Sequence, residues 1–269
     1  MAKVERIGVI GYGYVGKAMV EFFKRHYAVE ISDPVLGAAS ATRATINACD
    51  LAVVCVPTPM RDGGSCDTSI VEGVFEWLET DLVLLKSTVP PGTTDRLAAG
   101  FKGSIVFSPE YCGESSYWSP YAFDRDIKET PFFIFGGERP ATSAMVDVFL
   151  RVTGPCKTYR QTDARTAEVA KYMANTYFAT KVAYCYEMAT ACAKLGIDWN
   201  EARELWLLDP RVGPMHTAVF AENAKPFGGK CLPKDLGALI AASEQAGYTP
   251  ELLLEVQRTN ERLGNLRRG

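Results

Sequence analysis

The sequence predicts an α/β fold, with a doubly wound parallel sheet in the N-terminal part followed by an all-α part built on one long central helix. Short apolar runs alternate with amphipathic segments over about the first 160 residues, which is typical of parallel strands covered by helices on both faces. A glycine-rich turn follows the first apolar run directly. Residues 163–195 contain no Gly or Pro, so at roughly 1.5 Å per residue they can form a rod of about 45 Å.

The apolar runs are short and rich in Val, Ile, Leu and Phe, which favours strands. We expect strands at 4–10, 27–32, 51–56, 82–86, 104–108 and 131–137. The intervening segments predict helices at 17–26, 38–48, 68–78 and 141–151, with a short one after residue 91. Further helices are expected at 163–195, 198–208, 235–247 and 251–264. We therefore place one domain at 1–161 and a helical domain at 162–269.

The composition argues against several classes of protein. A chain of 269 residues with a net charge of -3 is long enough for two domains, and it offers no electrostatic basis for binding nucleic acid or an anionic membrane. No run reaches membrane-spanning length, and the first residues lack a secretion-signal pattern. The eight cysteines include no CxxC pair, so neither a zinc site nor a disulfide framework is indicated. We expect a cytoplasmic protein without a metal site.

The glycine-rich turn predicts a dinucleotide site. Gly11 permits a tight turn after the first strand, Gly13 lets a pyrophosphate approach the backbone, and Gly16 lets the following helix pack closely. The second strand ends in Asp33, which would bond the adenosine ribose hydroxyls and repel a 2′-phosphate. This context predicts a Rossmann-type domain that prefers NAD over NADP. The alternative role for Asp33 is to cap the turn before Pro34.

Three loops follow strands at the edge of the sheet where ligands bind in such folds. They read PTPMRDGGSCD after residue 56, STVPPGTT after 86 and PEYCGE after 108. Ser87 and Thr88 can touch the nicotinamide or the reacting carbon, although capping the next turn is an equally good interpretation. Glu110 and Glu114 can act as general acid and base, or they can be solvated loop residues.

The long helix carries a polar group on one side. Asp163 or Thr162 can cap its start and Gly196 can end it, while its apolar composition predicts that most of its circumference is covered by protein. Glu168, Lys171 and Asn175 are three and four residues apart and therefore share a face. They are either a structural ion pair with a capping amide or part of a site.

The loop PFGGKCLPKD at 226–235 places Cys231 in a turn, between Lys230 and Lys234 and just before a helix. A helix N-terminus and nearby cations favour a reactive thiolate. Such a thiolate can add to an aldehyde, and oxidation of the adduct by NAD gives a thioester that water cleaves to an acid. The alternative is a buried structural cysteine.

In the segment 209–226, Arg211 is either a surface charge or an anion clamp.

Together these motifs resemble the nucleotide-sugar dehydrogenases typified by UDP-glucose 6-dehydrogenase and GDP-mannose 6-dehydrogenase. The order and approximate spacing of the motifs follow that family over essentially the whole chain. The motifs are GYGYVG (11–16), VPTP (56–59), KSTVPPGTT (86–94), SPE with Glu114 (108–114), EVAKYMANTYFATKVAYCYE (168–187), DPRVG (209–213) and FGGKCLPKD (227–235).

The resemblance implies a four-electron oxidation of a sugar primary alcohol to a carboxylate with two NAD per turnover, UDP-glucose to UDP-glucuronate being the first choice. It implies a catalytic set of Cys231 as nucleophile, Lys171 and Asn175 at the oxyanion, Asp235, Thr88 and Glu110. It implies cofactor contacts at Gly11, Gly13, Tyr14, Val15, Gly16, Asp33, Pro57, Thr58, Ser87, Thr88 and Glu114. It implies substrate contacts at Glu110, Lys171, Asn175, Arg211, Phe227, Gly228 and Gly229. Whether Lys171, Glu110 or a water held by Thr88 and Asp235 takes the first proton stays open.

The resemblance also implies a homodimer through the long helix and a third, nucleotide-binding domain that this sequence lacks. Three explanations for that difference stand open: a compact enzyme, a longer chain cut at the hinge, or a lid supplied by another chain. Two other functions are also open. One is a single-step dehydrogenase of the 6-phosphogluconate and 3-hydroxyacid type, and the other is a catalytically silent NAD-binding module.

Overall fold

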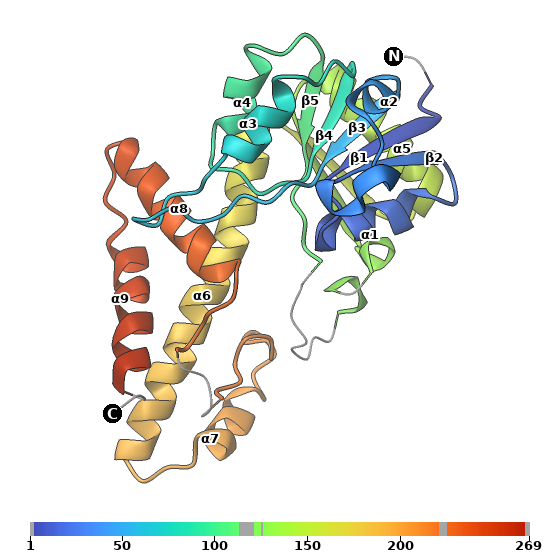
Figure 1. The fold of residues 1–269 in the computed structure, drawn as a ribbon. Coiled ribbons are helices and arrows are strands. Elements are labelled where there is room, and N and C mark those ends of the chain that lie inside the picture. Colours follow the sequence, from blue (N-terminus) through green and yellow to red (C-terminus); the bar gives the residue numbers. More distant parts are fainter. Residues whose placement is uncertain (1–2, 113–120, 125, 221–224, 267–269) are drawn as a thin grey trace. The chain divides into compact units, whose positions relative to one another are not determined.

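The computed structural model describes residues 3–112, 121–124, 126–220 and 225–266, which divide into two compact units (Figure 1). Unit 1 comprises Met1–Pro59 with Asp67–Lys171, and unit 2 comprises Met60–Cys66 with Tyr172–Gly269. The predicted boundary at residue 161 and this division differ in two respects. The division falls inside the long helix, and one short segment from the N-terminal half belongs with the helical unit.

Unit 1 is built on a sheet whose described strands lie in the order β2-β1-β3-β4-β5-β6-β7. The strands are β1 (Arg6–Ile10), β2 (Ala28–Ser32), β3 (Leu51–Val54), β4 (Leu82–Leu85), β5 (Ser104–Phe107), β6 (Phe132–Gly136) and β7 (Thr158–Thr162). Strands β1 to β5 pair in parallel, but β6 runs antiparallel to β5, and β7 pairs in parallel with β6. The predicted α/β fold with a parallel sheet is confirmed, and the antiparallel pairing of β6 with β5 is the one departure among the described strands.

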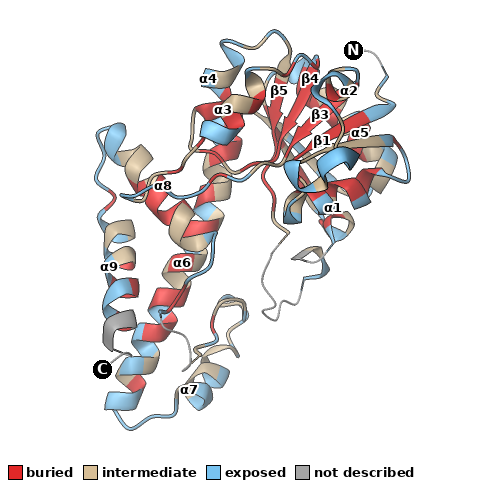
Figure 2. Cartoon of the chain, viewed as in Figure 1, coloured by how far each residue is buried: buried red, intermediate tan, exposed pale blue. Residues whose placement is uncertain are grey.

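Helices cover both faces of this sheet, as Figure 1 shows. They are α1 (Tyr14–Phe23), α2 (Arg43–Asn47), α3 (Ser69–Phe75), α4 (Thr93–Ala98) and α5 (Arg139–Thr153), with 3-10 helices η1 (Pro34–Ala39), η2 (Ala122–Asp124) and η3 (Ile127–Glu129). Successive strand residues point to opposite faces. In β3, Leu51 and Val53 join the core under α1 and α5, whereas Ala52 and Val54 join the core under α2 and α3. Both faces of the central strands are therefore buried (Figure 2).

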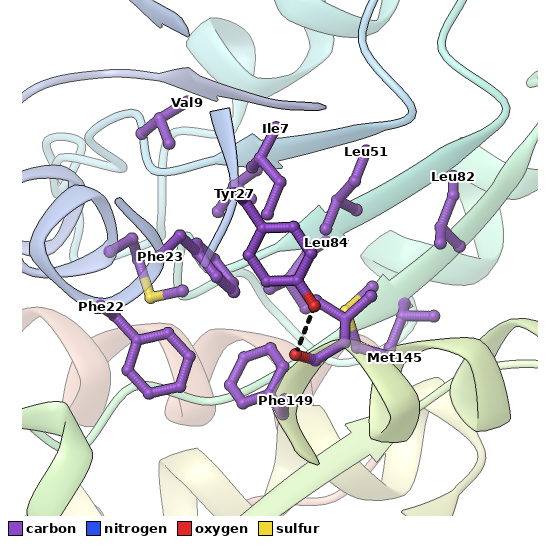
Figure 3. Packing of buried hydrophobic residues seen from close by; sticks show 14 of the residues in the cluster. Ile7, Val9, Phe22, Phe23, Tyr27, Leu51, Leu82, Leu84, Met145 and Phe149 are labelled. Carbon is purple, nitrogen blue, oxygen red and sulfur yellow. Dashed lines mark hydrogen bonds between the residues drawn. The ribbon is translucent and has the colours of Figure 1, made fainter. Parts of the chain in front are cut away.

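The core under α1 and α5 is rich in aromatic rings (Figure 3). The Phe149 ring lies 5.0 Å from the Phe22 ring and 4.9 Å from the Phe133 ring, measured between centroids. The buried Tyr27 hydroxyl donates a hydrogen bond of 2.9 Å to the Val148 carbonyl oxygen. This tight packing fixes α1, and hence the turn that precedes it, against the sheet.

The long helix α6 (Ala164–Lys194) has 31 residues and runs from unit 1 into unit 2. Asp163 caps its start by accepting hydrogen bonds from the Thr166 backbone N–H (2.8 Å) and hydroxyl (2.7 Å). Gly196, with φ of 73°, follows its end. The predicted helix and both of its end signals are confirmed.

Glu168, in the second turn of α6, is fully buried and turned toward α4. Its carboxylate accepts hydrogen bonds from the Thr94 hydroxyl (2.6 Å), the Thr94 N–H (2.8 Å) and the Gly92 N–H (2.5 Å). Burial raises the pKa of Glu168, and these hydrogen bonds oppose that rise. Glu168 therefore caps the N-terminus of α4 and joins that helix to α6 within unit 1.

Unit 2 packs the C-terminal part of α6 against α8 (Leu232–Gln245) and α9 (Glu251–Leu266). It also contains α7 (Trp199–Trp206), whose Trp206 ring lies 5.8 Å from the Tyr184 ring of α6. Its core includes Ala179 and Tyr186 of α6, Leu236 and Ile240 of α8, and Val256 of α9. Among the described helices of the whole chain, none combines the length and apolar character needed to span a membrane.

Two details of the helices differ from the sequence-based expectation. The segment 38–48 is not one helix, because Gly37 adopts φ of 53° and Ser40 is extended, so η1 ends there and α2 begins separately after Thr42. The long helix is covered on most of its circumference, as expected, but one side is left open by the described chain. A stripe of apolar side chains on one of its faces is exposed, namely Met173, Tyr177, Tyr184 and Met188.

Candidate active site

The glycine-rich turn between β1 and α1 has the shape that a dinucleotide phosphate requires. Gly11 has φ of +91°, and a Cβ there would lie 2.8 Å from the Cys55 carbonyl oxygen; a Cβ on Gly16 would lie 1.9 Å from the Gly11 oxygen. Gly13 is the N-cap of α1, yet a Cβ on it would meet no atom within 4 Å. Open space at a helix N-terminus fits the pyrophosphate of NAD. Of the other residues expected here, Tyr14 is exposed and Val15 packs on the core.

Replacing Gly13 by alanine is expected to weaken NAD binding by about tenfold or more without lowering the melting temperature. The backbone of Gly13, with φ of -74° and ψ of -159°, is one that alanine adopts, so only the approach of the phosphate is obstructed. Isothermal titration calorimetry and thermal unfolding measure the two quantities. Gly73→Ala is the matched control, because its added Cβ also meets open space. Equal NAD affinity in Gly13→Ala and wild-type protein would rule out this binding mode.

Asp33, directly after β2, binds backbone N–H groups of two turns, the glycine-rich turn and the turn that follows β2. Its Oδ2 accepts a hydrogen bond of 2.6 Å from the Tyr12 N–H, and its Oδ1 accepts one of 2.8 Å from the Val35 N–H. The alternative role predicted for Asp33, capping the turn before Pro34, is therefore present. Each carboxylate oxygen can accept a second hydrogen bond, so the contact with the ribose hydroxyls stays a prediction.

The loops after β3 and β4 are joined at the carboxyl edge of the sheet. The buried Ser87 hydroxyl donates to the Val56 carbonyl oxygen at 2.7 Å, and the buried Thr58 hydroxyl donates to the Thr88 carbonyl oxygen at 2.8 Å. Ser87 thus contacts the preceding loop rather than capping the following one. Pro57, next to Thr58, is exposed. The structure brings these four predicted cofactor residues together.

A buried ion pair joins β4 to the loop after β5. Lys86 Nζ lies 3.1 Å from Glu110 Oε2 and donates to the Pro109 carbonyl oxygen at 3.0 Å; the two side chains are 3% and 8% exposed. Glu110 Oε1 accepts from the N–H groups of Tyr111 (2.8 Å) and Cys112 (2.7 Å). Burial alone would raise the pKa of Glu110, but the Lys86 ammonium and the Cys112 N–H outweigh it and lower that pKa. Glu110 is therefore a charged, loop-organising group.

The residue after Glu110 connects this loop to the long helix. Lys171 Nζ lies 5.0 Å from the centre of the Tyr111 ring, a cation–π contact, and the Tyr111 ring packs edge-on against Phe132 at 5.2 Å. The Lys171 charge also helps to lower the pKa of Glu110. Burial, together with the Glu110 charge, raises the pKa of Tyr111 to about 12, so its phenol stays neutral. Two of the predicted catalytic residues, Glu110 and Lys171, are thus neighbours within unit 1.

In unit 2, Cys231 is the exposed N-cap residue of α8. Its carbonyl oxygen accepts the first helical hydrogen bond, from Asp235 N–H at 2.9 Å. The buried Asp235 carboxylate accepts from Asn175 Nδ2 at 2.5 Å and pairs with Lys234 Nζ at 2.6 Å. The expectation that Cys231 lies in a turn rather than a core is confirmed. Lys234 binds the carboxylate of Asp235, and Asn175 and Asp235 are brought together one helical turn beyond the thiol.

The remaining predicted residues lie in other environments. Arg211 is exposed and forms a bidentate pair with Asp209, through Nε at 2.9 Å and Nη2 at 2.6 Å. Gly228 and Gly229 are exposed, but the Phe227 side chain is buried in the core of unit 2 rather than presented to a ligand. The Phe227 N–H donates to Asn260 Oδ1 at 2.9 Å. Glu114 lies outside the described residues.

Sequence reasoning gave no role to two residues that the structure places at the centre of unit 1. Lys86 is the last residue of the predicted strand 82–86, and no other function is predicted for it from the sequence. A lysine directly before a Ser-Thr turn at the end of a strand is the one local signal of a functional role. Tyr111 stands between a predicted catalytic glutamate and a cysteine, and its contact with Lys171 bridges sixty positions of sequence. Nothing in the local pattern identifies that contact.

Comparison with known proteins agrees with this geometry. Residues 26–148 match the NAD binding domain, and residues 165–262 the central domain, of the UDP-glucose/GDP-mannose dehydrogenase family. UDP-glucose 6-dehydrogenase of Pseudomonas aeruginosa is 31% identical over 229 residues, covering 79% of this chain and 49% of the relative. The enzyme of the same name from Rickettsia conorii is 30% identical over 225 residues, covering 79% and 49%. The chain spans about half the length of these curated relatives.

Solved structures show the same architecture. A UDP-glucose dehydrogenase from the hyperthermophilic archaeon Pyrobaculum islandicum has a TM-score of 0.83 and 27% identity, covering 96% of this chain and 68% of that one. A UDP-D-ManNAc dehydrogenase from Pyrococcus horikoshii, with a TM-score of 0.78 and 24% identity over 96% and 68%, shares the fold. The glycine turn, the long helix and the matches to both domain profiles lead to one conclusion: the chain belongs to the UDP-glucose/GDP-mannose dehydrogenase family.

Proposed function

We propose that this chain carries the redox centre of an NAD-dependent nucleotide-sugar dehydrogenase that oxidises a primary alcohol to a carboxylate, with UDP-glucose as the first candidate substrate. The observation that carries the proposal is the arrangement at α8, where an exposed thiol opens the helix and Asp235 is held one turn later by Asn175. The names of the curated relatives support the reaction class. A cytoplasmic location, expected from the cysteine usage, stays a prediction.

The residues of unit 1 are suited to binding and charge stabilisation. The turn at Gly13 and the α1 N-terminus would hold the pyrophosphate, and NAD, when bound, supplies the acceptor for one hydride in each of two oxidations. The Lys171 ammonium, set against the Tyr111 ring, would stabilise negative charge on the substrate oxygen. Glu110, already charged and engaged by Lys86, would support the loop rather than carry a proton near neutral pH.

The residues of unit 2 would carry the covalent chemistry. After the alcohol has lost one hydride and one proton, Cys231 Sγ would form a bond to the aldehyde carbon as the C=O π bond opens, and the oxygen would take up the thiol proton as a hydroxyl group. Loss of a second hydride and the hydroxyl proton of that adduct gives a thioester on Cys231. Water, oriented by Asp235, then breaks the carbon–sulfur bond and restores the thiol. In total, two hydrides go to two NAD, one water is consumed and three protons are released per carboxylate formed.

The proposal is tested by incubating the protein with NAD and a panel of UDP-glucose, UDP-N-acetylhexosamines and GDP-mannose, and following NADH. We expect NADH from one nucleotide sugar and little with NADP, because Asp33 would repel the 2′-phosphate. A protein that binds NAD tightly yet forms no NADH with any member of the panel would contradict the proposal and favour a silent NAD-binding module.

We also propose that two copies of the chain pair through α6. The exposed apolar side chains Met173, Tyr177, Tyr184 and Met188 lie on one face of the helix, and burying them against a second copy removes that surface from water. Light scattering is expected to give a dimer mass for wild-type protein and a monomer mass for Tyr177→Glu. Lys194→Glu, an exposed change outside the stripe on the same helix, should remain dimeric. A monomeric wild-type chain would contradict the proposal.

A further inference from the structure

The segment 209–220 of unit 2, which contains Arg211, is held by side chains from two helices. Tyr186 of α6 accepts a hydrogen bond of 3.0 Å from the Phe220 N–H. Arg203 Nε of α7 donates to the Thr217 hydroxyl at 2.8 Å, and that hydroxyl donates to the Pro214 carbonyl oxygen at 2.7 Å. Both anchors lie on the C-terminal side of Arg211. A third anchor, Lys181, lies next to it.

Lys181 makes two hydrogen bonds to consecutive carbonyl groups of this segment. Its Nζ donates to the Val212 oxygen at 2.9 Å and to the Gly213 oxygen at 2.8 Å. The side chain is half-buried on a helix whose neighbouring residues Val182 and Ala183 belong to the core of unit 2. Burial lowers the pKa of Lys181, so the two carbonyl bonds compensate for the loss of water around its charge.

The carbonyl groups that Lys181 binds belong to the two residues directly after Arg211. The turn that carries Arg211 is closed by a hydrogen bond of 3.1 Å from the Val212 N–H to the Asp209 carbonyl oxygen. Arg211 itself is 88% exposed and bound to the Asp209 carboxylate. Its backbone is therefore fixed from α6, while its guanidinium faces solvent and can exchange Asp209 for another anion.

We propose that Lys181 is a positioning residue for Arg211, fixing the turn 209–213 so that the guanidinium is presented to the nucleotide-sugar substrate. This inference rests on the proposed function, because it takes Arg211 as a substrate contact. Lys181 donates both of its described hydrogen bonds to carbonyl oxygens of the turn, so we expect its effect on the substrate to pass through the turn. Loss of Lys181 should therefore weaken substrate binding while leaving NAD binding unchanged.

The test compares Lys181→Met, Lys181→Arg, Arg211→Met and the double variant with wild-type protein. We expect Lys181→Met to raise KM for the nucleotide sugar by about tenfold, with KM for NAD unchanged. Lys181→Arg should stay within about threefold of wild type, because a guanidinium can also donate to two carbonyl groups. In a protein that already carries Arg211→Met, adding Lys181→Met should raise KM for the nucleotide sugar little further. Lys194→Met, an exposed change on the same helix, should behave as wild type.

Hydrogen exchange gives a measurement that does not depend on catalysis. The Val212 amide, protected by its bond to Asp209, should exchange faster in Lys181→Met and at the wild-type rate in Lys181→Arg. Unchanged exchange, or an equal rise in KM with and without Arg211, would overturn the inference. Should Lys181→Met fail to fold, Lys181→Gln, which can reach one carbonyl group, is judged by the same two measurements. A wild-type chain that forms no NADH would instead overturn the proposed function, and the exchange rates would still decide whether Lys181 holds the turn.

Discussion

Replacing Cys231 by serine is expected to lower carboxylate formation by at least about 1,000-fold. The serine hydroxyl stays protonated near neutral pH and is a much weaker nucleophile than a thiolate, so neither the adduct nor the acyl intermediate forms at a useful rate. The aldehyde from the first oxidation should then accumulate or remain bound. Product analysis by mass spectrometry, with NADH measured in the same samples, distinguishes the two oxidation states of the sugar.

The control for this variant is Cys156→Ser, since Cys156 is also exposed but lies in a turn of unit 1 before β7. It should form carboxylate at the wild-type rate, which separates the loss of a particular nucleophile from a general effect of removing a thiol. Full carboxylate formation by Cys231→Ser would mean that no thioester at this position is needed. In that case the role given to the N-cap of α8 would be wrong.

The second large effect is expected from the buried pair of Lys86 and Glu110. Replacing Lys86 by methionine leaves the Glu110 charge at 8% exposure without its cation, and the free energy of unfolding should fall by about 3–5 kcal/mol. The double variant Lys86→Met/Glu110→Gln should recover much of this loss, because neither charge remains buried. Urea unfolding followed by circular dichroism measures all three proteins.

A matched control for the buried pair is the exposed ion pair of Arg96 and Glu72, whose side chains are 58% and 43% exposed. Arg96→Met should cost less than about 1 kcal/mol, since water already solvates both charges. Equal effects of Lys86→Met and Arg96→Met would show that the burial of Lys86 has no energetic consequence, and the loop at Glu110 would then need another explanation.

The same pair predicts how stability depends on pH. The pKa of Glu110 in the folded protein lies below its ordinary value of 4.5. The stability that the Glu110 carboxylate contributes is therefore fully present above pH 4.5 and is lost as the pH falls through the lowered pKa. The difference in unfolding free energy between wild type and Glu110→Gln should therefore narrow on acidification. Denaturant titrations between neutral pH and the acid range measure that difference, and a gap that widens toward low pH would contradict the assigned charge state.

Local pattern was sufficient to predict most of the fold. The strand at β3 and the turn at Gly11–Gly16 follow from alternation of apolar runs and from glycine spacing, and the ends of α6 follow from Asp163 and Gly196. The reversed direction of β6 could not be predicted, because a buried strand has the same apolar composition whether it pairs in parallel or antiparallel. The direction depends on the connection before it rather than on the strand.

The features of the candidate site that depend on sequence neighbours could be predicted, and those that depend on long-range contacts could not. The exposure of Cys231 follows from the two glycines before it and the helix after it. The ion pair of Glu110 does not follow from the residues beside it in the sequence, since Lys86 is 24 positions away. A loop glutamate is usually solvated, and only the packed structure shows that this one is buried against a cation.

The most direct test of the proposed reaction is the amount of NADH formed for each nucleotide sugar consumed by wild-type protein with its preferred substrate. Oxidation through a thioester on Cys231 predicts a ratio of two, because two hydrides leave the same carbon before water cleaves the acyl bond. A ratio of one, with an aldehyde or ketone as the final product, would contradict it.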